Sequence, residues 1–188
     1  MKPNEKETIF RFILDVHLGR LAKYLRLCGF DTLFSSYFED REIIETARRE
    51  NRIIVTRDRL LLKSAGDAEG YLVKSQYHDE QLREVFDRFG LKNHVRLFSR
   101  CISCNATLEE VKKEEIADRL LADTRKYFSS FKRCPLCDRI YWEGSHYDNM
   151  KKVSPRCSDA AAGGLWLTCG GRAALAVSMM PQKYFLNS

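Results

Sequence analysis

Short apolar runs alternate, over residues 1–94, with segments in which apolar side chains recur every three or four positions. The runs lie at residues 9–14, 30–34, 53–56 and 71–73 and predict four strands. The segments that follow them predict amphipathic helices. Runs without polar alternation are typical of strands buried on both faces, as in parallel sheets. The alternation therefore predicts right-handed βαβ crossovers and an α/β fold whose parallel sheet is covered by helices.

Acidic residues stand where the predicted strands end. Asp15 follows the first run, Asp58 follows the third, and Asp40 precedes the helix that comes after the second. Because ligands of open parallel sheets bind just past the carboxyl ends of the strands, we expect the three carboxylates at one edge. Carboxylate oxygens suit Mg²⁺ or Mn²⁺, and such an ion can hold a scissile phosphate and lower the pKa of an attacking water. The pattern indicates a candidate metal-dependent hydrolytic site.

These aspartates have a second interpretation. Aspartate is a preferred helix N-cap, and each of the three stands just before a helical segment, so both interpretations stay open. The basic residues near the same edge are Arg20, Lys23 and Arg57. They could bind the phosphates of a nucleic-acid backbone, or they could be solvated charges on helix surfaces.

The pattern changes after residue 95, where two C-x-x-C pairs appear. Cys101 and Cys104 are separated by 29 residues from Cys134 and Cys137. Two residues between ligands allow each pair to form a tight turn whose sulfurs converge on one tetrahedral zinc ion. A redox motif or two buried free pairs are the alternatives, but a redox C-x-x-C normally occurs once, within a thioredoxin-like unit. Four sulfur ligands close the coordination sphere, so this zinc would be structural.

Composition and charge narrow the class of protein. The net charge is +6, and residues 95–156 carry 13 Lys/Arg against 9 Asp/Glu, or +4, which favours a polyanionic partner. Residues 1–8 lack the apolar core of a signal peptide, and no run reaches the roughly 20 apolar residues of a membrane helix. The chain has seven cysteines, an odd number that disfavours a disulfide framework. We therefore expect a cytoplasmic protein without a membrane partner.

Several segments together resemble the Mut7-C RNase domain family. They are residues 12–31, 38–44 and 52–62, the two C-x-x-C pairs, and residues 141–147, so the resemblance covers roughly residues 9–152. It implies a PIN-like three-layer α/β/α sandwich at 9–94 and a four-cysteine zinc ribbon at 95–152. The remaining residues, 153–188, do not match that family; they are rich in Ala and Gly and show no amphipathic pattern, so we expect a disordered tail.

The resemblance also implies metal-dependent ribonuclease activity, with Asp15, Asp40 and Asp58 as the acidic positions. PIN-like nucleases often have a fourth acid, for which Asp79 is the nearest candidate unless it only caps its helix. We therefore expect a ribonuclease that uses Mg²⁺ or Mn²⁺ and no small-molecule cofactor, with a zinc ribbon that assists RNA binding. The alternative is a non-catalytic RNA-binding or adaptor module with the same fold.

Overall fold

The computed structural model describes residues 9–143. These residues form two compact units, divided after Thr107. The tail predicted at 153–188 lies outside the described residues, as does the end of the predicted zinc ribbon from residue 144 onward. Among the helices of residues 9–143, none combines the length and apolar character that crossing a lipid bilayer requires.

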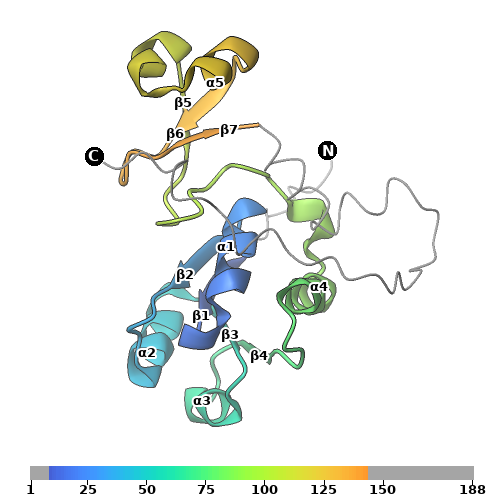
Figure 1. Ribbon diagram of the computed structural model, residues 1–188. Coiled ribbons are helices and arrows are strands. Elements are labelled where there is room, and N and C mark those ends of the chain that lie inside the picture. Colours follow the sequence, from blue (N-terminus) through green and yellow to red (C-terminus); the bar gives the residue numbers. More distant parts are fainter. Residues whose placement is uncertain (1–8, 144–188) are drawn as a thin grey trace, which may run out of the picture. The chain divides into compact units, whose positions relative to one another are not determined.

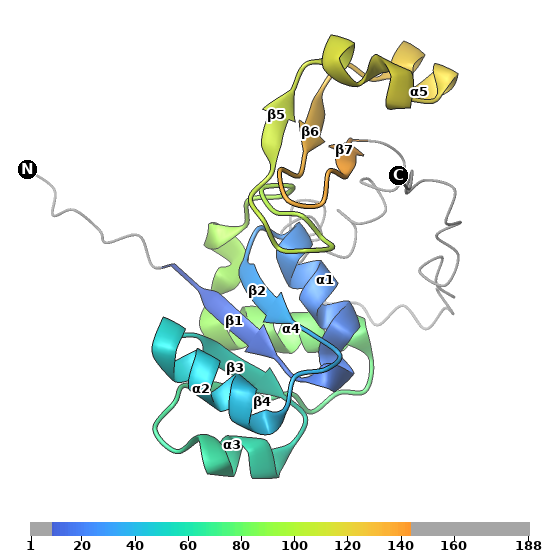
Figure 2. The ribbon, with the colours of Figure 1, turned by 90° about the vertical axis from the view of Figure 1, so that its left-hand side faces the viewer.

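The first unit is built on a four-stranded parallel sheet whose strands alternate with helices (Figures 1 and 2). The strands are β1 (Arg11–Leu14), β2 (Asp31–Phe34), β3 (Ile53–Thr56) and β4 (Gly70–Leu72), and the helices are α1 (Gly19–Leu27), α2 (Asp40–Glu50), α3 (Arg59–Ala65) and α4 (His78–Phe89). Two 3-10 turns, η1 (Val16–Leu18) and η2 (Leu91–His94), follow β1 and α4. The parallel α/β architecture predicted from the apolar runs is confirmed.

Helices cover both faces of this sheet, which gives three layers (Figure 2). On one face, Ile13 of β1 and Ile54 of β3 form a buried cluster with residues of α2 and α3. On the other face, the Phe12 ring meets Phe30 and Phe89 edge to face, with ring centroids 6.0 and 5.7 Å away. Successive residues of a strand point to opposite faces, so each buried strand contributes to both cores.

The strand order, β2-β1-β3-β4, places a topological switch point between β1 and β3. The chain leaves β1 toward β2 and leaves β3 toward β4, in opposite directions across the sheet. Connections that diverge in this way open a crevice beyond the carboxyl ends of the two central strands, where α/β proteins bind their ligands. Leu14 pairs with Val55, so Asp15 and Thr56 come next at the same level of the sheet.

The second unit contains a small antiparallel sheet in the order β5-β6-β7. Its strands are β5 (Glu109–Val111), β6 (Phe131–Arg133) and β7 (Ile140–Trp142), and the link between the first two carries η3 (Lys113–Arg119) and α5 (Ala122–Tyr127). The Phe131 side chain is buried, and its ring lies 6.4 Å from that of Trp142. An aromatic pair of this kind supplies a core for a sheet too small to bury many aliphatic residues.

Candidate functional site

Asp15 lies at the carboxyl end of β1, buried to 4% exposure. Its Oδ1 accepts a hydrogen bond from the backbone N–H of His17 (2.7 Å), which makes Asp15 the N-cap of η1. Its Oδ2 accepts from the Thr56 hydroxyl and from the Arg57 N–H, the latter at 3.0 Å. An ionised carboxylate has about four acceptor positions, so three are used and one is left for a ligand.

Asp58 follows the neighbouring strand β3 and is exposed. Its Oδ1 accepts from the Leu60 N–H at 2.7 Å and so caps α3, while its own N–H donates to the Thr56 hydroxyl at 2.8 Å. Thr56 therefore links the two acidic positions: its hydroxyl donates to the carboxylate of Asp15 and accepts from the backbone of Asp58.

Asp40 is placed differently from the other two aspartates. It is the exposed first residue of α2, whose N-cap is Glu39; the Glu39 N–H donates to the side chain of Glu42 at 3.0 Å. The capping interpretation thus describes Asp15 and Asp58 but not Asp40. All three follow strands that end at the carboxyl edge, and Asp40 follows β2, the neighbour of β1.

The three aspartates share an edge without forming a compact ligand cluster. Among the described residues, only the four cysteines form a group of three or more possible metal ligands whose ligand atoms lie close to one another. The three basic candidates also belong to this edge: Arg20 and Lys23 are exposed on α1, and the exposed Arg57 stands between Thr56 and Asp58.

Asp79 lies in the first turn of α4, whose N-cap is Tyr77. Asp79 and Arg20 both act on the Tyr24 hydroxyl. Burial raises the pKa of this hydroxyl, the charge of Arg20 opposes that increase, and the charge of Asp79 adds to it. Asp79 is therefore near Tyr24 of α1 but does not occupy the cap position of its own helix.

Thr56 is the site residue that the sequence analysis missed. Its only signal in the sequence is a hydroxyl at the end of a buried aliphatic run, two residues before an aspartate. That signal is weak because threonine is an ordinary strand residue.

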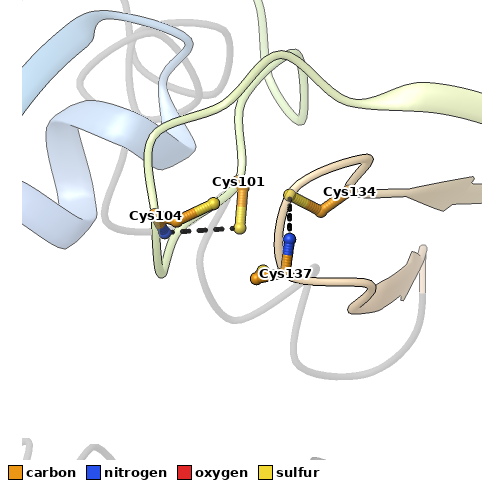
Figure 3. A group of neighbouring side chains, drawn as sticks. All are labelled: Cys101, Cys104, Cys134 and Cys137. Carbon is orange, nitrogen blue, oxygen red and sulfur yellow. Dashed lines mark hydrogen bonds between the residues drawn. The ribbon is translucent and has the colours of Figure 1, made fainter.

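The four cysteines come together as the sequence predicted (Figure 3). Their sulfur atoms all lie within 4.8 Å of one another, with Cys101 and Cys134 buried and Cys104 the most exposed. Four soft thiolates at this spacing could hold a zinc ion.

The two C-x-x-C turns have the same backbone structure. The N–H of the first cysteine donates to the carbonyl five residues later, and the N–H of the second donates to the first cysteine's sulfur at 3.4 Å. Each turn ends in a left-handed residue, Asn105 (φ 72°) or Asp138 (φ 59°), a conformation that Asn and Asp tolerate best after glycine. The N–H···S bonds hold the sulfur atoms of Cys101 and Cys134 in a fixed orientation.

The first of these turns is bound to the amino end of β2. Oδ1 of Asn105 accepts from the Thr32 N–H (2.9 Å), and its Nδ2 donates to Asp31 Oδ1 (2.8 Å). Arg26 of α1 donates to the carbonyl of Ser103 at 2.7 Å. Asp31 in turn forms an ion pair with Arg52 at 2.8 Å. Burial alone would raise the pKa of Asp31, but the hydrogen bonds from Arg52 and Asn105 outweigh it and hold that pKa below its usual value.

No match was found among curated proteins or among solved structures. The family model described as the Mut7-C RNAse domain matches residues 10–154, which include both acidic strand ends, Thr56 and all four cysteines. Because that match covers most of the 188 residues, the chain belongs to the Mut7-C RNase domain family.

Proposed function

We propose that this chain is a metal-dependent ribonuclease with a PIN-like fold, which hydrolyses RNA phosphodiester bonds with Asp15, Asp40 and Asp58. Membership of an RNase domain family supports a nuclease-type function. The observation that carries the proposal is the arrangement at the switch point, where Asp15 and Asp58 follow the two central strands and share the Thr56 hydroxyl.

Carboxylate oxygens are the ligands that a hard divalent cation prefers. Asp15 is a buried carboxylate with one acceptor position left, and Asp58 and Asp40 are exposed at the same edge. Bound there, Mg²⁺ or Mn²⁺ would stabilise negative charge on the phosphate and lower the pKa of an attacking water. Thr56 and the Arg57 N–H fix the Asp15 carboxylate in place.

The exposed basic side chains of this edge would bind the RNA backbone. Arg57 directly precedes Asp58, and Arg20 and Lys23 are exposed on α1, the helix that follows Asp15, so all three could pair with backbone phosphates. Their contribution would be electrostatic, so RNA binding should weaken steeply with salt.

The four cysteines would hold a structural zinc ion. All four ligands are sulfur, so the ion would have no open position for water and would take no part in hydrolysis. The first C-x-x-C turn is attached at the amino end of β2, and Asp40 follows the carboxyl end of the same strand. We propose that the zinc ribbon assists RNA binding.

The experiment is an RNA cleavage assay with Mn²⁺, its inhibition by EDTA, and two variants. Asp58→Asn is the sharper one, because asparagine caps helices as well as aspartate does while losing the ligand charge, so the fold should stay intact. Asp15→Asn removes the second carboxylate. We expect at least a 100-fold loss of cleavage in each variant. RNA binding without cleavage, unchanged by either substitution, would identify a non-catalytic RNA-binding module instead.

A further inference from the structure

Exposed apolar side chains gather at the carboxyl edge of the parallel sheet. In the first unit, within residues 9–107, the large hydrophobic residues that lie exposed are Ile9, Val16, Tyr37, Leu60 and Tyr77. Each of the other four comes within five residues after the end of a different strand of the parallel sheet. Single exposed apolar residues are ordinary on protein surfaces. Their presence at the edge that carries the acidic residues favours a ligand with apolar faces.

Two of the four are tyrosines, and they follow the two outer strands. Tyr37 comes after β2 and is 89% exposed, and Tyr77 comes after β4 and is 68% exposed. Asp15 and Asp58 follow β1 and β3, which lie between those outer strands. His78, the residue after Tyr77, stacks on the Tyr24 ring of α1 with ring centroids 5.7 Å apart. Tyr77 therefore lies close to α1, the helix that follows Asp15 and carries Arg20 and Lys23.

The same local structure holds both tyrosines. Each belongs to a Ser-x-Tyr sequence in which the tyrosine N–H donates to the serine hydroxyl two residues before it, at 3.1 Å for Ser35 and 3.0 Å for Ser75. Such turns fix the backbone through a local side-chain contact. The backbone that carries each ring is thus ordered although the ring itself is exposed.

Carboxylates of α4 brace the second of these turns further. Glu84 accepts from the N–H groups of Lys74 (2.9 Å) and Ser75 (2.8 Å), and the Ser75 hydroxyl donates to Glu80 at 2.6 Å. A rigid aromatic side chain presented in this way loses little conformational entropy when a flat ligand stacks on it.

We propose that Tyr37 and Tyr77 are stacking platforms for unpaired bases of single-stranded RNA bound at the carboxyl edge of the sheet. Exposed aromatic rings beside phosphate-binding basic residues are the usual means of holding single strands, because every base has a flat face. In a duplex, the bases stack on one another and cannot reach the rings. This inference rests on the proposed function, since it requires RNA at the carboxyl edge.

The test measures the affinity of the full chain for labelled oligonucleotides by fluorescence anisotropy, without added divalent cation. Three probes are compared: a single-stranded RNA, the same strand in a duplex, and an abasic strand with the same number of phosphates. The variants are Tyr37→Ala and Tyr77→Ala, with Tyr37→Phe and Tyr77→Phe as ring-retaining partners. Ile9→Ala is the control, since Ile9 is 69% exposed and precedes β1, away from the carboxyl ends of the strands.

We expect each alanine variant to bind the single strand about 5- to 100-fold more weakly. The phenylalanine variants and Ile9→Ala should bind as the wild type does, and affinity for the abasic strand should not change. Unchanged binding of the single strand by both alanine variants would overturn the inference, and so would an equal loss with the abasic strand.

A cleavage assay on the wild-type chain separates this inference from the proposed function. Cleavage that depends on Asp58, together with tyrosine variants that bind normally, would refute the stacking platforms and leave the ribonuclease proposal standing. Ring-dependent binding in a chain that never cleaves RNA would support the platforms and refute the ribonuclease proposal.

Discussion

The hydroxyl of Thr56 donates a hydrogen bond to Oδ2 of Asp15, a residue 41 positions earlier in the chain. Thr56 has no exposed surface, and its hydroxyl also accepts from the Asp58 N–H. One buried oxygen atom therefore fixes the orientation of the first acidic side chain and the backbone of the second. The identity of residue 56 should matter to both stability and activity.

Thr56→Val keeps the shape of the side chain and removes both hydrogen bonds. Because the Asp15 carboxylate then loses a buried donor, we expect the free energy of unfolding to fall by about 1–3 kcal/mol. RNA cleavage should fall more in Thr56→Val than in Thr56→Ser, since serine retains the hydroxyl. Urea unfolding and the cleavage assay measure the two effects. A valine variant as stable and active as the serine variant would show that the hydroxyl has no such role.

Asp31→Asn should destabilise the protein at neutral pH. The substitution removes one of the two carboxylates that pair with the buried Arg52 guanidinium, the other being Glu50, and it weakens the contact with Asn105, so we expect a loss of about 1–3 kcal/mol. Urea unfolding at pH 7 measures it, with Glu45→Gln as the control, because the Arg41–Glu45 pair is exposed and should contribute almost nothing.

The cost of Asp31→Asn should depend on pH in a defined direction. The pKa of Asp31 in the folded state lies below its ordinary value of 3.8, so its ionised form stabilises the fold. This contribution is complete above about pH 4 and is lost as the pH falls through the folded-state pKa. The difference in stability between wild type and variant should therefore shrink below pH 4. A difference that stays constant down to pH 3 would contradict the charge-based explanation.

Two glycines with positive φ should respond differently to alanine. At Gly29 (φ +94°) an added Cβ would collide with the carbonyl oxygen of Arg96, whereas at Gly90 (φ +64°) it would meet nothing within 4 Å. Gly90→Ala should cost only the backbone strain, about 1 kcal/mol. Gly29→Ala should cost at least 2 kcal/mol more, because backbone atoms must move apart. Thermal unfolding of the two variants, compared side by side, tests the difference.

Removal of zinc should act mainly on the second unit. Metal analysis should give one zinc per chain, and Cys134→Ser should lower that value. Because a structural zinc site contributes its binding free energy to folding, proteolysis of the variant should begin within residues 108–143. Cys28→Ser is the control, since Cys28 is a buried cysteine of the first unit that does not belong to the four-cysteine group. Purified wild-type protein without zinc would refute the metal assignment.

The buried apolar runs predicted the parallel sheet because strands covered on both faces need continuous apolar sequence. The run at 53–56 matches β3 at both ends, while the first run was predicted two residues too long: β1 begins at Arg11, and Ile9 is 69% exposed. Strand order was not predictable, since it depends on which helices pack together rather than on any one segment.

The candidate site was predictable to a different extent in its two parts. The four cysteines could be predicted because metal ligands impose fixed spacings on a sequence. The edge occupied by Asp15 and Asp58 followed from the parallel sheet. The long-range hydrogen bonds of the two sites could not be predicted in this way: Thr56 and Asp15 are 41 residues apart, and Asn105 and Thr32 are 73 apart. Such pairs are made by tertiary packing and leave no periodic pattern.

The attachment of Asn105 to β2 also bears on the order in which the metal site assembles. Hydrogen bonds from Asn105 and Arg26 hold the loop of Cys101 and Cys104 without any help from an ion. Half of the ligand set is therefore ordered as soon as the parallel sheet has folded, and only Cys134 and Cys137 remain to be recruited. Pre-ordering two ligands lowers the entropy lost on metal binding. Folding of the RNase sheet should thus prepare the chain to capture its zinc.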